Sequence, residues 1–228
     1  MMFRSIISKW VILFLIILLP GILILFFSSA KHEFNKLPIV SDSINFKTNE
    51  FLDQDSVVFS DDIFKDKINV VCFFFSRCPS ICPPMITNMN WLKNHFDKFH
   101  DINFISLTID PEYDTPSVLG SYIIENRIID RCDYRKNWYF LTGSRESIYN
   151  LAEDLFVSVK SDVKAPGGYL HSGSFILLDK EGRVRSRKDD NGNILAVYDG
   201  TSFVDVKNLQ KDIQVLKAEY IENEQSKR

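Results

Sequence analysis

Two cysteines in the stretch FFFSRCPSICPPM, residues 73–85, are the strongest candidates for chemistry in this chain. Cys78 and Cys82 are separated by the three residues Pro-Ser-Ile. A thioredoxin-type redox motif has only two residues between its cysteines, so this spacing departs from that motif. Two adjacent sulfurs can close a disulfide or hold a soft metal cation. A redox pair, a metal clip and two incidental thiols are all open at this point.

The segments on either side of the cysteines predict where their sulfurs lie. The nearly continuous apolar run Ile68 to Ser76 is typical of a central strand that is covered on both faces. The apolar residues after Pro83 recur at helical spacing, which predicts a helix with one apolar stripe. That stripe consists of Met85, Met89, Leu92, Phe96 and Phe99. Both sulfurs are therefore expected at a helix N-terminus, aimed from positions i and i+4 at one point, where the helix dipole favours thiolates.

Two sulfurs alone make an incomplete site for most metals, so a histidine ligand is sought. His95 and His100 lie on or just beyond the predicted helix, on its solvated side, and His32 lies in a polar segment. His171 follows a Pro-Gly-Gly loop and leads directly into a core strand, and loops at strand ends present side chains to a site. A set of two cysteines and one histidine suits copper, especially Cu(I), and could also take zinc.

The other sulfur-containing residues are assigned structural roles. Cys72 lies inside the predicted strand and is expected to pack as a small apolar residue. Cys132 lies in a polar segment, and a Cys72–Cys132 disulfide is a weaker alternative to two unpaired thiols. Met85 and Met89 could bind Cu(I) as thioethers, but their helical spacing with Leu92 favours a place in the core.

The remaining apolar segments alternate between strand and helix. A hairpin is expected over 46–60, strands over 102–110, 137–143 and 173–182, and a second hairpin around Asn191-Gly192. Helices are expected over 115–129, from Ser144 onward and through Leu209 to Tyr220. This order predicts an α/β sandwich around a central sheet. Open α/β sheets bind ligands beyond the carboxyl ends of their strands, where the cysteine pair is expected.

The N-terminal segment predicts a membrane anchor. Residues 10–27 carry no charge and would reach about 27 Å as a helix, close to the thickness of the hydrocarbon core. Arg4 and Lys9 place the tail 1–9 in the cytoplasm. A cleaved signal peptide is the alternative, but its apolar core is usually shorter and FFSSAKHE is a poor cleavage site. The prediction is an anchor at 10–27, a linker at 28–45, a folded domain at 46–221 and a polar tail at 222–228.

Charge excludes one class of partner. The chain carries 27 Lys and Arg against 30 Asp and Glu, and Arg4 and Lys9 are its only charged residues before Lys31. The part beyond the anchor is therefore more acidic than the whole chain. A nucleic-acid partner requires a basic face, so we expect none.

Three segments resemble the SCO/SenC family of copper-binding, membrane-anchored, thioredoxin-like proteins. They are FFFSRCPSICPPM, SLTIDPEYDTPSVLGSY and LHSGSFILLDKEGRV, and the similarity runs from about Phe46 to Leu216. The resemblance implies a thioredoxin-like sandwich with a central mixed sheet, preceded by one transmembrane helix. It also implies copper, as Cu(I) or Cu(II), bound by Cys78, Cys82 and His171.

The resemblance further implies a role in cytochrome c oxidase assembly. The partner would be subunit II, which receives copper at its binuclear site, or another copper-accepting exported protein. The implied location is the bacterial inner membrane, single-pass, with the C-terminal domain in the periplasm. Asp110-Pro111 and Asp114-Thr115-Pro116 match the middle family segment, and we assign them a structural role first.

Two questions stay open from the sequence. Many family members have Asp immediately before the histidine, where this chain has Leu170, which puts the orientation of the ligating ring and the affinity in doubt. A metallochaperone is favoured, but a thiol–disulfide oxidoreductase using Cys78 and Cys82 remains an alternative. A copper or redox sensor is a third interpretation, which no residue supports directly.

Overall fold

The computed structural model describes residues 14, 16, 18–22, 36–44, 46–126, 137–162, 164–189 and 191–225. The chain forms two compact units, Met1–Asn35 and Lys36–Arg228. In the first unit the described residues are helical. Among the described residues, no helix combines the length and apolar character that crossing a bilayer requires. Most of the anchor predicted over 10–27 lies outside these residues.

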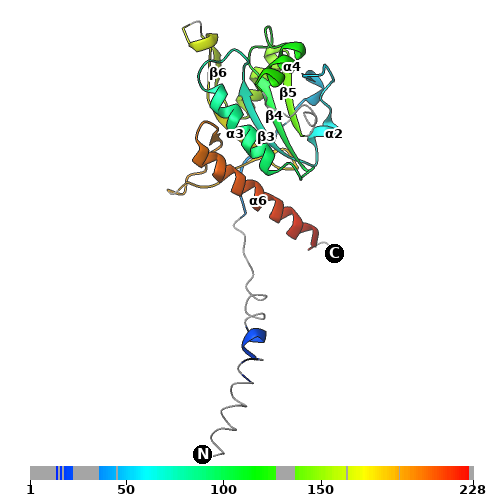
Figure 1. Ribbon diagram of the computed structural model, residues 1–228, viewed down its shortest axis with the longest axis vertical. Coiled ribbons are helices and arrows are strands. Elements are labelled where there is room, and N and C mark those ends of the chain that lie inside the picture. The colour runs from blue at the N-terminus through cyan, green and yellow to red at the C-terminus, as the bar shows by residue number, and fades with distance from the viewer. Residues whose placement is uncertain are drawn as a thin grey trace, which may run out of the picture. The chain divides into compact units, whose positions relative to one another are not determined.

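The second unit is built on one mixed sheet, drawn as arrows in Figure 1. Its strand order is β1-β9-β8-β3-β4-β5-β2, and β10 pairs with β8. The strands β3, β4 and β5 are parallel, whereas the other pairs in this sheet are antiparallel. The strands are β1 (Ile39–Ser43), β2 (Phe51–Asp53), β3 (Ile68–Phe74), β4 (Ile102–Thr108), β5 (Trp138–Gly143), β8 (Ser174–Leu178), β9 (Arg183–Arg185) and β10 (Tyr198–Asp199).

The two central strands explain the apolar runs in the sequence. All seven residues of β3 and all seven of β4 are buried. A strand covered on both faces has no need of alternating polar residues, so it reads as a continuous apolar segment. The predicted α/β architecture with a central mixed sheet is therefore confirmed.

Helices cover the sheet, and α3 lies beside α6 (Figure 1). Proline at the first position of α4 and the Ser144 side chain, which accepts from the Ser147 N–H at the start of α5, confirm both predicted helix starts. The helices are α2 (Asp61–Phe64), α3 (Cys82–His95), α4 (Pro116–Glu125), α5 (Arg145–Asp154) and α6 (Phe203–Gln225), with short 3-10 turns η1 (Thr48–Glu50) and η2 (Pro166–Gly168).

The end of α3 corrects one prediction. The helix stops at His95, and Phe96 caps it with its backbone N–H still bonded to Leu92. Phe99, which the predicted stripe includes, lies beyond the helix and is 41% exposed. Its ring is instead covered by the Lys217 ammonium, 3.5 Å from the ring centre. A stripe read at constant spacing overran the helix because the spacing continues through the turn that follows.

Two segments near the start of the unit join the sheet. Ile39–Ser43, which lie in the predicted linker 28–45, form the edge strand β1 and pair with β9. The hairpin predicted over 46–60 is shorter than expected. Its arms are joined by an antiparallel bridge between Leu52 and Val58 and by backbone bonds from Phe59 N–H to the Phe51 carbonyl and from Asp53 N–H to the Val57 carbonyl. The strand β2 of that segment pairs mainly with β5.

A small second sheet leads to His171. The strands β6 (Val159–Ser161) and β7 (Tyr169–His171) form an antiparallel pair that is separate from the main sheet. Only Ser172 and Gly173 separate β7 from the core strand β8. The segment carrying His171 is therefore joined to the core by the chain, but its own backbone ladder goes to β6.

Candidate metal centre

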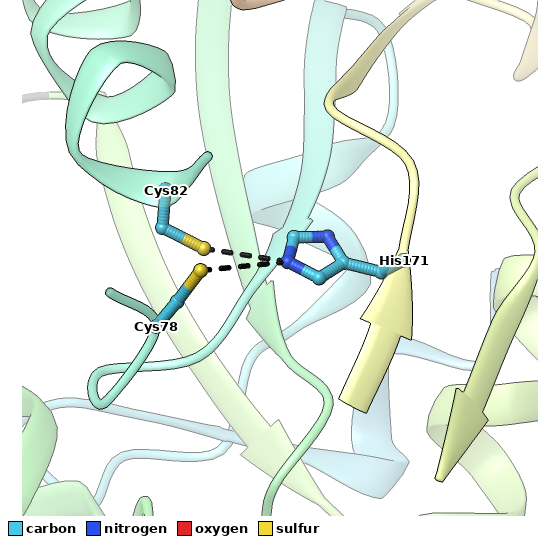
Figure 2. A group of neighbouring side chains, drawn as sticks. All are labelled: Cys78, Cys82 and His171. Atoms are coloured by element: carbon cyan, nitrogen blue, oxygen red, sulfur yellow. Dashed lines mark hydrogen bonds between the residues drawn. The ribbon is translucent and has the colours of Figure 1, made fainter. Parts of the chain in front are cut away.

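Three side chains from two distant stretches of sequence meet at one point. Figure 2 shows both cysteine sulfurs aimed at the same ring nitrogen of His171. The His171 Nε2 atom lies 3.4 Å from the Cys82 Sγ and 4.0 Å from the Cys78 Sγ. All three ligand atoms lie within 4.8 Å of one another. The three predicted site residues are therefore brought together.

These separations match the demands of a small metal ion. Metal–sulfur distances near 2.3 Å and metal–nitrogen distances near 2.05 Å, at tetrahedral angles, place sulfur and nitrogen about 3.6 Å apart. The two observed distances lie on either side of that value. Two thiol sulfurs and one imidazole form a donor set for soft or borderline cations such as Cu(I) and Zn(II). The chemistry and spacing of the residues present therefore fit a metal ion.

The two cysteines occupy different local structures, which corrects one prediction. Cys82 is the first residue of α3 and is followed by two prolines, whose missing N–H groups cost nothing in the first helical turn. Cys78 lies in the loop before the helix, with its N–H bonded to the Phe75 carbonyl 3.1 Å away. The sulfurs thus converge through a loop that folds back, and not as positions i and i+4 of one helix.

The two thiols of the pair differ in acidity, although a helix N-terminus predicts thiolates for both. Hydrogen bonds with the Cys82 thiol and the His171 side chain, together with the backbone N–H groups of Ser80 and Cys82, hold the pKa of Cys78 well below its usual range. The hydrogen bond to Cys78, together with burial, raises the pKa of Cys82. Cys78 is therefore the more acidic thiol of the pair. Two thiolates side by side would repel each other in this buried place.

The ring of His171 is oriented from both sides. Its Nδ1 atom lies 3.2 Å from the carbonyl oxygen of Ser172, which can only accept a hydrogen bond. Nδ1 therefore donates, and Nε2 faces the two sulfurs. The ring also packs edge-on against Phe75, with ring centres 5.6 Å apart. A backbone carbonyl that fixes the ring in this way is a common support for a metal-binding histidine.

The middle family segment, residues 110–116, has the structural role that the sequence analysis assigned to it, and it acts at the cysteine loop. Asp114 is fully buried and accepts bonds from the Ser76 N–H, the Ser76 hydroxyl and the Thr108 hydroxyl. Asp110 accepts from Arg77, the residue before Cys78. Both carboxylates follow β4, the neighbour of β3, so their place at the carboxyl end of the sheet was the available signal. Thr115 precedes α4 as predicted, but its side chain makes no capping bond.

Leu170 lies on the other side of its strand from His171. Successive side chains of a strand point to opposite faces, and the burial of β7 follows that alternation. Leu170 pairs with Lys160 and is 49% exposed. A carboxylate at this position would therefore not touch the His171 ring directly.

The other candidates lie away from the three ligands. Met85 and Met89 are buried in the core, which confirms their assignment. The Cys72 sulfur lies 3.3 Å from the Ser106 hydroxyl, and burial raises the pKa of this thiol to about 12. His95 bonds to Gln210, and His100 is exposed. His32 and Cys132, with the possible Cys72–Cys132 disulfide, lie outside the described residues. In the described part of the chain, no other group of three potential ligands converges.

Comparisons of the whole chain with known proteins find relatives of one kind. The family model described as SCO1/SenC matches residues 44–201. A Bacillus subtilis "SCO1 protein homolog" is 31% identical over 166 residues, covering 70% of this chain and 81% of that protein. A "SCO2-like protein" of Rickettsia prowazekii is 30% identical over 142 residues, which cover 59% of this chain and 64% of that protein.

Solved structures extend the comparison to the fold. A SCO1/SenC family lipoprotein from Bacillus anthracis superposes with a TM-score of 0.62 at 28% identity, covering 77% of this chain and 95% of that one. ScoI of Arabidopsis thaliana with copper bound gives a TM-score of 0.53 over 72% of this chain and 94% of that one. Its identity is 22%, so this likeness concerns the fold alone.

Proposed function

This chain belongs to the SCO1/SenC family, and on that premise we propose that it binds copper through Cys78, Cys82 and His171 for cytochrome c oxidase assembly. The observation that carries the proposal is the convergence of the three ligand atoms within 4.8 Å. Support also comes from relatives, which include a "putative copper-binding protein" of Stutzerimonas stutzeri, 28% identical over 140 residues.

We propose that copper is cargo, passed to the binuclear site of subunit II or to another copper-accepting exported protein. The exposure of the ligands suggests an order of exchange. His171 is the most exposed of the three, and Cys82, at 1% exposure, is the least. An incoming ligand would displace the neutral imidazole first, because its loss leaves no unpaired charge in the site. Cys82 would release the ion last.

We propose that residues 10–27 anchor the chain in the bacterial inner membrane, with the domain that begins near Lys36 in the periplasm. The support is the uncharged run with Arg4 and Lys9 on its N-terminal side. An exported partner lies outside the cytoplasm, so copper exchange with such a partner requires this location.

A thiol–disulfide oxidoreductase is the second candidate, favoured by the thiolate character of Cys78 beside the Cys82 thiol. The Cys78 thiolate would attack a partner disulfide and release one partner thiolate, giving a mixed disulfide. Cys82, after losing its proton, would then attack Cys78 and release the second partner thiolate. The partner gains two electrons and the chain becomes a disulfide. A disulfide switch has been identified in BsSco, a member of the Sco family of cytochrome c oxidase assembly proteins that is 27% identical to this chain.

Copper titration of the reduced full-length chain tests the first proposal. We expect one tightly bound Cu(I) per chain, and at least tenfold weaker binding for His171→Ala, since the variant loses one of three ligands. His95→Ala is the matched control, because His95 bonds to Gln210 away from the sulfurs. Absence of copper binding, or unchanged affinity in His171→Ala, contradicts the proposal. Reduction of a partner disulfide that survives His171→Ala but not Cys78→Ser would favour the oxidoreductase instead.

A further inference from the structure

The position of His171 relative to the two sulfurs is not fixed by backbone pairing with the main sheet. Along β7, the residue pairs are Ser161–Tyr169, Lys160–Leu170 and Val159–His171, all with β6. Among the described strands, none of the main sheet pairs with β7. Side chains must therefore hold β7 against the loop that carries Cys78 and the start of α3.

The Tyr169 side chain links β7 to the segment that follows β4. Tyr169 lies two residues before His171 on the same strand, so both side chains point to the same face. Its hydroxyl donates to the Asp110 Oδ1 at 2.8 Å, and its ring packs 5.3 Å from the ring of Phe75. Phe75 is also the ring against which His171 packs.

Asp110 carries the connection to the cysteine loop. Its other oxygen, Oδ2, accepts from the Arg77 guanidinium at 2.5 Å, and Arg77 directly precedes Cys78. The Asp110 carboxylate is almost completely buried, with 3% of the residue exposed. One carboxylate thus joins the residue next to the first sulfur ligand to the strand that bears the nitrogen ligand.

The direction of the Tyr169 hydrogen bond is fixed by Arg145. The Arg145 Nη2 atom lies 3.3 Å from the Tyr169 hydroxyl oxygen and can only donate. Arg145 is itself held by two bonds to Glu112, at 2.9 and 2.7 Å. The hydroxyl therefore accepts from Arg145 and sends its single proton to Asp110.

Backbone packing allows the close approach. Gly167 has φ +78° in the turn before β7, and a Cβ atom at this position would lie 2.6 Å from the Phe75 ring. A side chain here would push the turn away from Phe75 and from the cysteine loop. Because glycine has no Cβ, the turn can pack closely against Phe75, which places the Tyr169 hydroxyl within hydrogen-bonding distance of Asp110.

We propose that Tyr169 is the positioning residue for His171, and that its hydrogen bond to Asp110 sets how closely Nε2 approaches the two sulfurs. The inference rests on the proposed metal-binding function of the site. The Tyr169 hydroxyl bonds to Asp110 and Arg145 and to none of the three candidate ligands. It acts through Asp110 and Arg77, which hold the other half of the donor set.

The test compares Tyr169→Phe with Tyr149→Phe in the full-length chain. The first variant keeps the ring against Phe75 and removes only the hydroxyl. Tyr149 is the matched control, because its hydroxyl donates to the Ile109 carbonyl at 3.3 Å and not to a residue of β7. Cu(I) affinity is measured by competition with a chromophoric chelator. We expect Tyr169→Phe to bind about tenfold more weakly, as for other residues that orient metal ligands, and Tyr149→Phe to match the wild type.

A second readout needs no metal. Nuclear Overhauser contacts between the His171 ring protons and the Cys78 and Cys82 β-protons report their approach in the reduced metal-free chain. We expect these contacts to weaken in Tyr169→Phe while the urea midpoint stays near that of Tyr149→Phe. Retained contacts with affinity within twofold of the wild type would overturn the inference, as would equal losses in both variants. If the wild type binds no copper, the proposed function fails, but the proton contacts still test the role of Tyr169.

Discussion

At the scale of single residues, Cys78 and Cys82 are chemically unequal although their types are the same. Cys82 is the more deeply buried and donates its proton toward Cys78, which lies at the edge of the site. A thiolate supported by a neighbouring thiol and by backbone N–H groups is ready to bind a metal or to attack a disulfide. The asymmetry therefore serves both candidate functions: Cys78 would attack first in thiol–disulfide exchange, and Cys82 would release the ion last in copper transfer.

This asymmetry predicts a pH profile for alkylation. Because the pKa of Cys78 is lowered, its thiolate should persist well below the usual cysteine pKa of about 8.5 and disappear only as the pH falls through the lowered value. In the reduced metal-free chain, we expect iodoacetamide to label Cys78 at pH 6. Mass spectrometry of labelled peptides over pH 4–9 measures the profile.

Two controls accompany the labelling. Cys82→Ala removes the donated hydrogen bond, so the labelling midpoint of Cys78 should move upward. Cys72 should stay unlabelled in the folded chain, because it is buried and burial raises its pKa. A Cys78 midpoint near 8.5 in the wild type would contradict the lowered pKa of this thiol.

At the scale of secondary structure, the site depends on where two adjacent parallel strands end. The cysteine loop follows β3, and the segment from Asp110 to Asp114 follows β4. Asp114 ties the two together through Ser76 and Thr108. The middle family segment, through Asp114, thus fixes the position of the loop before α3.

Asp114→Ala should damage both folding and metal binding. The change leaves the Ser76 N–H and two hydroxyls without an acceptor in a buried place, which we expect to cost roughly 3 kcal/mol of unfolding free energy. Urea denaturation measures the loss, and the Cu(I) affinity of the folded fraction should fall as well. Glu146→Ala, an exposed carboxylate on α5, is the control and should change the unfolding free energy by less than about 0.5 kcal/mol. Equal unfolding free energies of the two variants would contradict the stabilising role of the Asp114 hydrogen bonds.

At the scale of the whole second unit, a buried ionic network joins the first residues of the unit to its last helix. Arg185 on β9 bonds to Asp179, to Glu219 on α6 and to the backbone carbonyl of Leu37. Glu219 also accepts from the Leu37 N–H. The first residues of the unit are thereby fastened to its last helix, at a place separate from the metal ligands.

Arg185→Met should therefore destabilise the unit without changing the site. The variant leaves the buried carboxylates of Asp179 and Glu219 without this partner, which costs about 3–5 kcal/mol. Arg183→Met is the matched control on the same strand. Its guanidinium is partly exposed and pairs with Asp179 and Glu181, so about 1 kcal/mol is expected.

Denaturant midpoints measure the difference between these two arginine variants. Cu(I) affinity of the folded Arg185→Met chain should equal that of the wild type, because the network does not touch Cys78, Cys82 or His171. A loss in Arg185→Met no larger than in Arg183→Met would contradict the role of the network.

The sequence by itself determined the central strands, most helix starts and the three candidate ligands. Apolar runs, prolines at first helical positions and capping serines are local signals, and they were sufficient for β3, β4, α4 and α5. The order of three motifs was sufficient to select Cys78, Cys82 and His171 among four cysteines and four histidines.

Only the tertiary structure decided how these parts act on one another. It made Cys78 more acidic than Cys82, added β1 to the sheet and ended α3 before Phe99. It also turned Leu170 away from the site and linked Tyr169 to Asp110 across 59 positions of sequence. Shifts in pKa, burial and long-range hydrogen bonds depend on which side chains come into contact in the folded chain. The local periodicity of the sequence does not specify those contacts.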